Sequence, residues 1–201
     1  MEPLPESNRT ASATHNSGPL DYEFVIIGAG FGGMGVAIQL NRMGIDDICI
    51  IDRASDLGGT WHLNTYPGLA VDIPSTTYSY SFEPNPRWSR LFAPGAELKD
   101  YAVRVAKKYN LRRYMRFNTA VERAVYDSCS SSWTVYTDSG DSVCGRILIM
   151  ATGFLSQPKF PNIPGLDSFQ GKLIHTSMWD HDYELAGKRA AVIGTGATSV
   201  Q

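Results

Sequence analysis

Three glycines near the N-terminus have the spacing of a dinucleotide phosphate site. Residues 23–33 read EFVIIGAGFGG, in which a short apolar run precedes Gly28, Gly30 and Gly33. In such a turn the first glycine lets the chain reverse, the second lets the backbone approach a diphosphate, and the third lets a helix pack closely on the sheet. The N-terminus of that helix offers free N–H groups and a partial positive charge to an anion. The pattern predicts a bound dinucleotide.

An acidic residue stands where such a site holds a ribose. The apolar run DICIID, residues 47–52, ends in Asp52, nineteen residues after Gly33. A carboxylate in this position accepts hydrogen bonds from ribose hydroxyls. Strand, turn, helix, second strand and acid follow one another in register. We therefore expect a βαβ unit that binds a nucleotide, and not a glycine-rich turn without a ligand.

The chain then enters a long segment rich in glycine, proline and tyrosine. It begins at Gly58-Gly59-Thr60-Trp61 and continues as NTYPGLAVDIPSTTYSYSF, residues 64–82, with Asp72 embedded in it. Loops of this length inside a compact domain are usually functional. From composition alone, an ordinary ordered surface loop remains an equal alternative.

The later segments predict the elements that would complete such a domain. Residues 95–109 have the apolar period of a covering helix, and residues 114–151 read as short strands with a hairpin near Gly140. The run ILIMATG predicts a buried strand whose glycine brings the backbone close to a cofactor. KRAAVIG, residues 188–194, predicts another strand before a second glycine turn. The predicted buried face of the helix consists of Leu98, Ala102, Val105 and Tyr109.

Composition excludes several classes of protein. A formal charge of −2 gives no electrostatic footprint for nucleic acid, and no apolar run approaches the roughly 18 residues that span a bilayer. Residues 1–20 have neither the basic start nor the apolar core of a signal peptide and predict a disordered lead-in. The cysteines Cys49, Cys129 and Cys144 lack metal-site or disulfide spacing. We expect a reducing, cytoplasmic setting and no metal.

Several motifs resemble those of Baeyer–Villiger-type flavin monooxygenases. GAGFGG, DLGGTW, YPGLAVDIPS, YSYSF, the ATG at 151–153 and the final GTGATS occur in the family's order over residues 21–201. The segment FQGKLIHTSMWD matches the fingerprint F-x-G-x-x-x-H-x-x-x-W-[PD] at Phe169, Gly171, His175, Trp179 and Asp180. Without the resemblance, the two aromatic residues would be read as core packing and His175 as a hydrogen-bonded turn histidine.

The resemblance implies two cofactors, FAD in the first site and NADPH in the second. The residues implied to contact FAD are Gly28, Gly30, Gly33, Asp52, Thr60, Trp61, His62, Leu63, Asp72, Tyr78 and Val121. The residues implied to meet the nicotinamide cofactor are Ala70, Val71, Asp72, Gly194, Thr195, Gly196, Ala197, Thr198 and Ser199. The acid usual in the family is glutamate, for which Asp52 is a shorter substitute.

The reaction implied by the resemblance is the insertion of oxygen beside a ketone carbonyl, giving an ester or lactone. NADPH would supply a hydride to FAD, and O₂ would supply the oxygen, while the protein orients the reactants and excludes water. Asp72 would act electrostatically beside the flavin by holding a cationic partner that stabilises negative charge. The family places that arginine beyond Ser199, so the sequence assigns it to no residue.

The expected fold is α/β, a Rossmann-like FAD-binding domain with a small antiparallel segment, followed by the incomplete start of an NADP-binding domain. We predict the FAD-binding domain at 21–165, a linker carrying the fingerprint at 166–187, and the second domain from 188 to 201. We expect the chain to be the front part of a longer enzyme that binds FAD weakly alone. Two alternatives stay open, an N- or S-oxygenating flavin monooxygenase and a non-catalytic flavoprotein.

Overall fold

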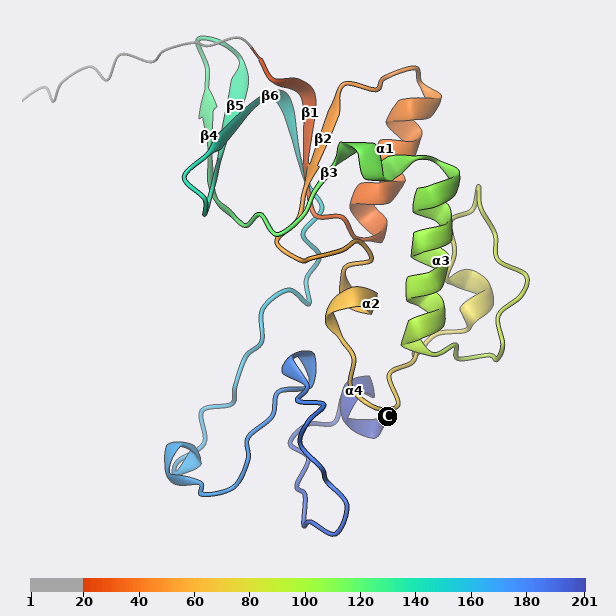
Figure 1. Ribbon diagram of the computed structural model, residues 1–201, viewed down its shortest axis with the longest axis vertical. Helices are drawn as coiled ribbons and strands as arrows, with labels where there is room; N and C mark the ends of the chain where they lie inside the picture. Colours follow the sequence, from red (N-terminus) through yellow and green to blue (C-terminus); the bar gives the residue numbers. More distant parts are fainter. Residues whose placement is uncertain (1–19) are drawn as a thin grey trace, which may run out of the picture.

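The computed structural model describes residues 20–201, and all but the last residue of the predicted lead-in lies outside this range. Its upper part is a six-stranded sheet with helices, from which the C-terminal quarter of the chain extends (Figure 1). The strands are β1 (Tyr22–Ile27), β2 (Ile48–Ile51), β3 (Met115–Arg116), β4 (Val121–Asp127), β5 (Ser132–Thr137) and β6 (Ser142–Met150). The α-helices are α1 (Phe31–Arg42), α2 (Thr60–Leu63), α3 (Gly95–Lys108) and α4 (Ala197–Val200).

The sheet combines a parallel nucleotide-binding half with an antiparallel half. Its strand order is β3-β2-β1-β6-β5-β4. β1 pairs in parallel with β2 and β6, and β2 pairs in parallel with β3. β4, β5 and β6 are antiparallel neighbours. Because β1, β2 and β6 run in one direction, their carboxyl ends meet at one edge, the edge where open α/β sheets bind ligands. This is the α/β arrangement that the sequence predicts.

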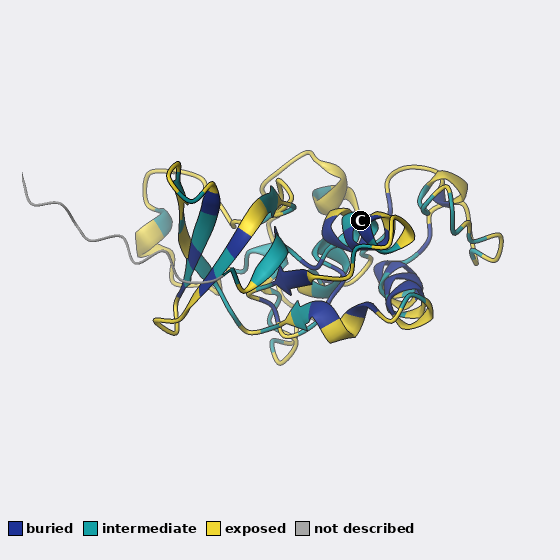
Figure 2. Cartoon of the chain, turned by 90° about the horizontal axis from the view of Figure 1, so that it is seen from above, coloured by how far each residue is buried: buried dark blue, intermediate teal, exposed yellow. Residues whose placement is uncertain are grey.

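Two helices cover one face of the parallel strands. Ile26 on β1 and Ile50 on β2 are fully buried beneath apolar residues of α1 and α3. Figure 2 shows buried stretches, in dark blue, on both strands and helices. α3 buries Leu98, Ala102 and Val105, as its apolar period predicts. Tyr109, the last residue of the predicted face, is the C-cap, because α3 ends at Lys108.

Alternate residues of the same strands form a second core on the opposite face. Val25, Ile27, Cys49 and Ile51 pack there with Val135 of the antiparallel half. A strand directs successive side chains to opposite faces, so both sides of β1 and β2 must be apolar. Cys49 is a buried core residue, and burial raises the pKa of its thiol to about 11, which keeps it protonated and unreactive.

Two predicted strands differ from the structure. β6 forms, but Ile147 is 40 % exposed and Met150 is 63 % exposed, so its description as a buried strand is wrong. The apolar cluster beneath α1 and α3 has its buried strand residues on β1 and β2 and reaches β6 only at the partly buried Ile149. Residues 188–194 form no strand, and Val192 and Ile193 are more than half exposed. An extended segment needs a neighbouring strand for its backbone hydrogen bonds, and the described chain offers none there.

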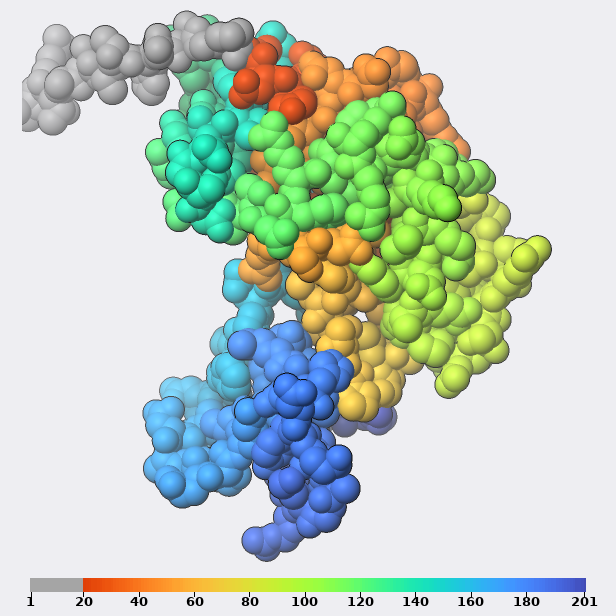
Figure 3. Space-filling model, in the orientation of Figure 1, coloured from red at the N-terminus to blue at the C-terminus, as the bar shows by residue number. Residues whose placement is uncertain are grey.

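Residues 158–201 form a separate lobe with little regular structure. Apart from α4 the lobe contains two short 3₁₀ turns, Leu166–Ser168 and Thr176–Met178. In Figure 3 it extends away from the sheet and approaches the main body again near its C-terminal end. The predicted boundaries at 165 and 187 fall inside this lobe and stay predictions.

Candidate functional site

The first glycine turn connects β1 to α1 and is shaped by close backbone packing. Gly28 has φ +110°, which favours glycine, and its N–H donates to the Ile51 carbonyl at 2.8 Å. A side chain on Gly28 would collide with the Ala151 carbonyl, and one on Gly33 with the Gly28 carbonyl. These two glycines are therefore required by the fold itself.

Gly30 has a different reason to lack a side chain. It is the N-cap of α1 with φ −77°, and an added Cβ would lie 3.6 Å from the Gly59 Cα, an ordinary contact. The fold would tolerate alanine here, but Gly30 lines a cavity that a methyl group would enter. No side chain caps α1, and the first N–H groups of a helix lack acceptors within it. The turn thus presents hydrogen-bond donors to an anion.

The cavity at this turn has a volume of about 600 Å³ and follows the carboxyl ends of the parallel strands. It brings together residues that lie far apart in the sequence. Of the residues predicted to contact the first nucleotide, it is lined by Gly28, Gly30, Asp52, Thr60, Trp61, Leu63, Tyr78 and Val121. Gly33 and His62 do not line it, and neither does Asp72.

Asp52 joins the end of β2 to the glycine turn. One carboxylate oxygen accepts a hydrogen bond from the Ala29 N–H at 2.6 Å, and the other accepts from the Ala54 N–H at 2.8 Å. The sequence predicts ribose as the partner of this acid but does not predict these backbone contacts. Each carboxylate oxygen can accept more than one hydrogen bond, so both roles are compatible.

Trp61 and Tyr78 form the aromatic end of the cavity. The Trp61 Nε1–H donates to the Tyr78 hydroxyl at 2.9 Å, and the two rings meet edge to face with centroids 5.4 Å apart. Burial raises the pKa of Tyr78, while the hydrogen bond from Trp61 opposes that rise. Tyr78 is therefore a neutral hydrogen-bonding group near pH 7 that fixes the orientation of the indole ring.

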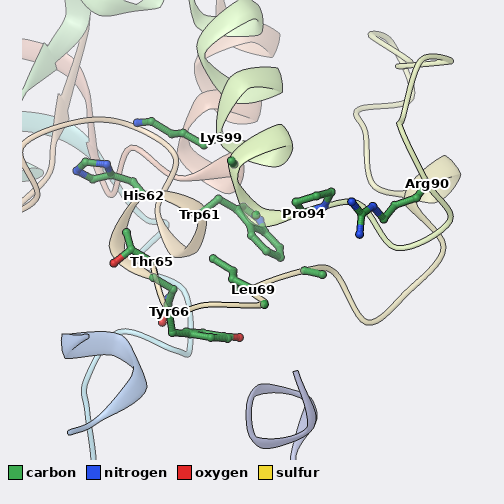
Figure 4. A pocket seen from close by; sticks show the side chains of 13 residues that line it. Trp61, His62, Thr65, Tyr66, Leu69, Arg90, Pro94 and Lys99 are labelled. Atoms are coloured by element: carbon green, nitrogen blue, oxygen red, sulfur yellow. The ribbon is translucent and has the colours of Figure 1, made fainter. Parts of the chain in front are cut away.

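A second cavity, of about 610 Å³, is also lined by Trp61 (Figure 4). His62, Tyr66, Leu69 and Lys99 line it together with the start of α3. His62 Nε2 lies 3.1 Å from the Ser55 hydroxyl. Burial and then the positive charge of Lys99 lower the pKa of His62. His62 is thus neutral at pH 7, and it does not line the first cavity.

Three residues of the long loop are implied to meet the nicotinamide cofactor, and their environments differ. Ala70 lines the second cavity, and Val71 is buried beside Ala93 and Leu98 of the helix region. Asp72 is exposed, and within residues 20–201 no hydrogen bond or ion pair engages its carboxylate. Its negative charge is felt at Tyr78, where it acts to raise the pKa.

The fingerprint residues lie in the C-terminal lobe, outside both cavities. The Phe169 ring packs over Gly171, where a side chain would collide with it. Phe169 is nevertheless 58 % exposed, so core packing does not describe it. His175 Nδ1 lies 2.8 Å from the Ser177 hydroxyl and accepts from the Ser177 N–H, which makes it a hydrogen-bonded turn histidine.

Asp180 forms an ion pair inside this lobe, and its neighbour His181 attaches the lobe to the long loop. Asp180 pairs with Lys172 at 2.6 Å, and hydrogen bonding to Lys172 lowers the pKa of the carboxyl. His181 Nε2 lies 2.8 Å from the Thr65 hydroxyl in the long loop. Trp179, the residue before Asp180, is half-buried.

The second glycine turn forms with part of its helix. Gly194 has φ +145°, Gly196 is the N-cap of α4, and Ala197 begins the helix. Ser199 donates from its hydroxyl to the Gly196 carbonyl at 2.7 Å. The predicted set Gly194, Thr195, Gly196, Ala197, Thr198 and Ser199 is largely exposed and lies near the long loop, not near the first cavity (Figure 1).

Sequence reasoning missed part of the first cavity. Arg53 and residues 155–157 line it, and the Arg53 guanidinium donates to the Ser156 carbonyl. Thr119 and Ala120 also line it, just before Val121. The signal that could have found them is topological, because segments that follow β3 and β6 must emerge at the same sheet edge as the glycine turn.

None of the helices within residues 20–201 is long and apolar enough to cross a membrane. Within the same residues, no group of three or more histidine, cysteine or acidic side chains is arranged to hold a metal ion.

Comparison with known proteins identifies relatives of this arrangement. A family profile described as pyridine nucleotide-disulphide oxidoreductase matches residues 25–201. A Baeyer–Villiger monooxygenase of Streptomyces coelicolor is 47 % identical over 176 residues, which are 88 % of this chain and 34 % of the relative. Cyclohexanone 1,2-monooxygenase of an Acinetobacter species is 39 % identical over 186 residues, 90 % of this chain and 34 % of the relative.

Solved structures show the same relationship. A crystal structure of OTEMO in complex with FAD and NADP superposes with a TM-score of 0.83 at 38 % identity, covering 91 % of this chain and 36 % of that one. The chain spans about a third of the length of the relatives that it matches. It therefore belongs to the pyridine nucleotide-disulphide oxidoreductase family, and within that family it corresponds to the N-terminal third of the Baeyer–Villiger monooxygenases.

Proposed function

We propose that this chain forms the flavin-binding part of a Baeyer–Villiger monooxygenase that uses FAD, NADPH and O₂ to convert a ketone to an ester or lactone. One observation carries the proposal. A single cavity at the strand ends gathers the glycine turn, Asp52, the Trp61–Tyr78 pair and Val121. The relatives named above are monooxygenases, and the solved OTEMO structure contains FAD and NADP.

The shape and chemistry of the cavity fit FAD. The space beside Gly30, which a side chain would fill, and the uncapped start of α1 suit a diphosphate. Asp52 at the end of β2 suits a ribose, and Val121, which also lines the cavity, would contact the adenine side. Thr60, Trp61 and Tyr78 would then line the isoalloxazine ring. FAD would supply the capacity to accept a hydride from NADPH and to activate O₂.

The protein side chains would orient the reactants and control charge. The Trp61–Tyr78 hydrogen bond holds the Trp61 indole ring as an aromatic wall at the ring end of the cavity. The exposed carboxylate of Asp72 is available to hold a cation beside that wall, which would stabilise negative charge formed on the ketone oxygen. The second glycine turn would bind the phosphates of NADPH, and Ala70 would line its approach. The three free cysteines support the cytoplasmic setting that the sequence predicts.

FAD binding tests the proposal directly. The purified chain is titrated with FAD and separately with FMN, and quenching of flavin fluorescence reports binding. We expect FAD to bind at least tenfold more tightly than FMN, because FMN lacks the ribose and adenine that Asp52 and Val121 would contact. Equal affinity for FMN would contradict the assigned orientation, and no uptake of either flavin would reject the proposed function.

The oxygenation reaction requires its own measurement. Chain loaded with FAD is supplied with NADPH under air and either a cyclic ketone or a tertiary amine, and products are analysed by gas chromatography. Lactone formation would support the proposed reaction. N-oxide formation without lactone would favour an N-oxygenating enzyme instead. We expect turnover by this chain to be low, because the cationic partner of Asp72 is assigned to no residue in it.

A further inference from the structure

The side-chain amide of Gln201 binds both backbone groups of Ala70. Its Nε2–H donates to the Ala70 carbonyl at 2.8 Å, and its Oε1 accepts from the Ala70 N–H at 3.3 Å. The two residues are 131 positions apart in the sequence. The contact joins the segment that follows the second glycine turn to the long loop beside the first cavity.

The Gln201 side-chain amide takes the place beside Ala70 that the backbone of a neighbouring strand would occupy. On one edge of the extended segment 69–71, the Leu69 carbonyl accepts from the Gly95 N–H at 2.8 Å, and the Val71 N–H donates to the Ala93 carbonyl at 3.0 Å. Ala70 forms an antiparallel bridge with Pro94 in the same register. Backbone groups of alternate residues in an extended chain point to opposite edges. The Ala70 groups therefore face away from α3, and the Gln201 amide satisfies them.

Two more contacts fix Gln201 against the loop. The Tyr66 hydroxyl donates to Gln201 Oε1 at 2.8 Å, and Tyr66 is only 7 % exposed. Gly68 has φ +86°, and a Cβ on it would lie 2.5 Å from the Gln201 backbone carbonyl oxygen. The long loop thus supplies the buried Tyr66 hydroxyl as a donor to Gln201. Because Gly68 has no side chain, the loop also leaves room for the Gln201 backbone.

We propose that Gln201 is a positioning residue that sets the backbone of residues 70–72 and thereby the place of the Asp72 carboxylate. Val71 is anchored in the core, so Gln201 and residues 93–95 together hold both edges of the extended segment that leads into Asp72. The effect of this placement on a flavin depends on the proposed function. The contact itself, and its influence on residues 70–72, do not.

Amide hydrogen exchange tests the contact without any cofactor. In Gln201→Ala the Ala70 N–H loses its acceptor, and we expect it to exchange at least about fivefold faster. The Val71 N–H, bound to Ala93, should change less than about twofold and serves as an internal check on folding. The matched control is Gln170→Ala, which removes an amide that donates only to the Ser168 carbonyl. Unchanged exchange at Ala70 in Gln201→Ala would overturn the inference.

A second experiment measures the reduction midpoint potential of flavin bound to the chain. A nearby carboxylate disfavours reduction of the flavin, so Asp72→Asn should raise the potential. Gln201→Ala, which frees Asp72 to move away, should shift the potential in the same direction, and Gln170→Ala should match the original chain. If Asp72→Asn shifted the potential and Gln201→Ala did not, the positioning role would be rejected. If the original chain took up no FAD, the proposed function would fail, and the exchange at Ala70 alone would decide this inference.

Discussion

The carboxylate of Asp52 accepts a hydrogen bond from the backbone N–H of Ala29, 2.6 Å away, inside the turn that follows β1. Its second oxygen accepts from the Ala54 N–H, so one side chain satisfies two backbone donors on different segments. A partly buried donor left without an acceptor costs about 1–3 kcal/mol. Asp52 therefore stabilises the glycine turn in addition to any ribose that it binds.

Replacing Asp52 should weaken both the fold and FAD binding. We expect Asp52→Ala to lower the free energy of unfolding by about 1–3 kcal/mol, measured by urea denaturation, and to reduce FAD affinity at least tenfold. Asp47→Ala is the control, because Asp47 also accepts one backbone N–H, that of Glu23 at 3.0 Å, but in an exposed position away from the cavity. A loss of FAD binding with unchanged stability would show that the Ala29 contact contributes little.

Alanine substitutions at Gly30 and Gly33 should have different effects, one on FAD binding and the other on stability. Gly30→Ala adds a methyl group that the fold accommodates but the cavity does not. We expect FAD affinity to fall at least tenfold with a melting temperature within about 2 °C of the original. Gly33→Ala forces a collision with the Gly28 carbonyl and should cost about 1–3 kcal/mol, with a clear drop in melting temperature. Thermal unfolding with and without FAD distinguishes the two, and an equal drop for both variants would contradict the assignment.

Local signals in the sequence predict the βαβ unit well. Apolar period, glycine spacing and the terminal acid at 52 depend on neighbours within about twenty residues, and α3 ends one residue from its predicted limit. Gly28, Gly30 and Asp52 converge on one cavity because consecutive parallel strands have only one way to place their carboxyl ends. The sequence distance between these residues is short, and their spatial relation follows from it.

The parts that sequence did not predict depend on contacts between distant segments. Arg53 meets Ser156 across 103 positions, and Gln201 meets Ala70 across 131. No period or motif encodes either pair. The exposure of Met150 on β6 likewise depends on which other segments cover the sheet, and not on the apolar run itself. Such features follow from the assembled fold alone.

An ion-paired carboxylate makes stability depend on pH in the acidic range. Asp56 lies 2.7 Å from both Lys99 of α3 and Arg112. Burial acts to raise the pKa of Asp56, but hydrogen bonds from Lys99, the Leu57 N–H and Arg112 outweigh it and lower the pKa from 3.8 to about 2. Because the folded chain binds this proton less readily than the unfolded chain, the stabilisation is complete above about pH 4 and is lost as the pH falls toward 2.

Asp56→Asn should therefore lower the free energy of unfolding by about 1 kcal/mol at pH 7. The difference from the original chain should shrink between about pH 4 and pH 2, the range between the unfolded and folded pKa values. Urea denaturation at a series of pH values measures it. Asp100→Asn, which changes an exposed carboxylate on α3, should have little effect throughout. A difference for Asp56→Asn that stayed constant down to pH 2 would exclude the ion pair as its source.

Trp61 lines both cavities, so its substitution should act on the flavin end of the site and not on the fold. Trp61→Phe keeps an aromatic ring against Tyr78 but removes the Nε1–H donor. Because that donor stabilises the phenolate, its loss should raise the pKa of Tyr78 further, which an ultraviolet titration detects. FAD should bind several-fold more weakly, with an altered visible spectrum. Trp133→Phe changes a tryptophan that packs against Tyr126 on the distant hairpin and should alter neither property. If both variants changed the flavin spectrum equally, Trp61 would have no special place beside the flavin, and the orientation proposed for FAD in the first cavity would be wrong.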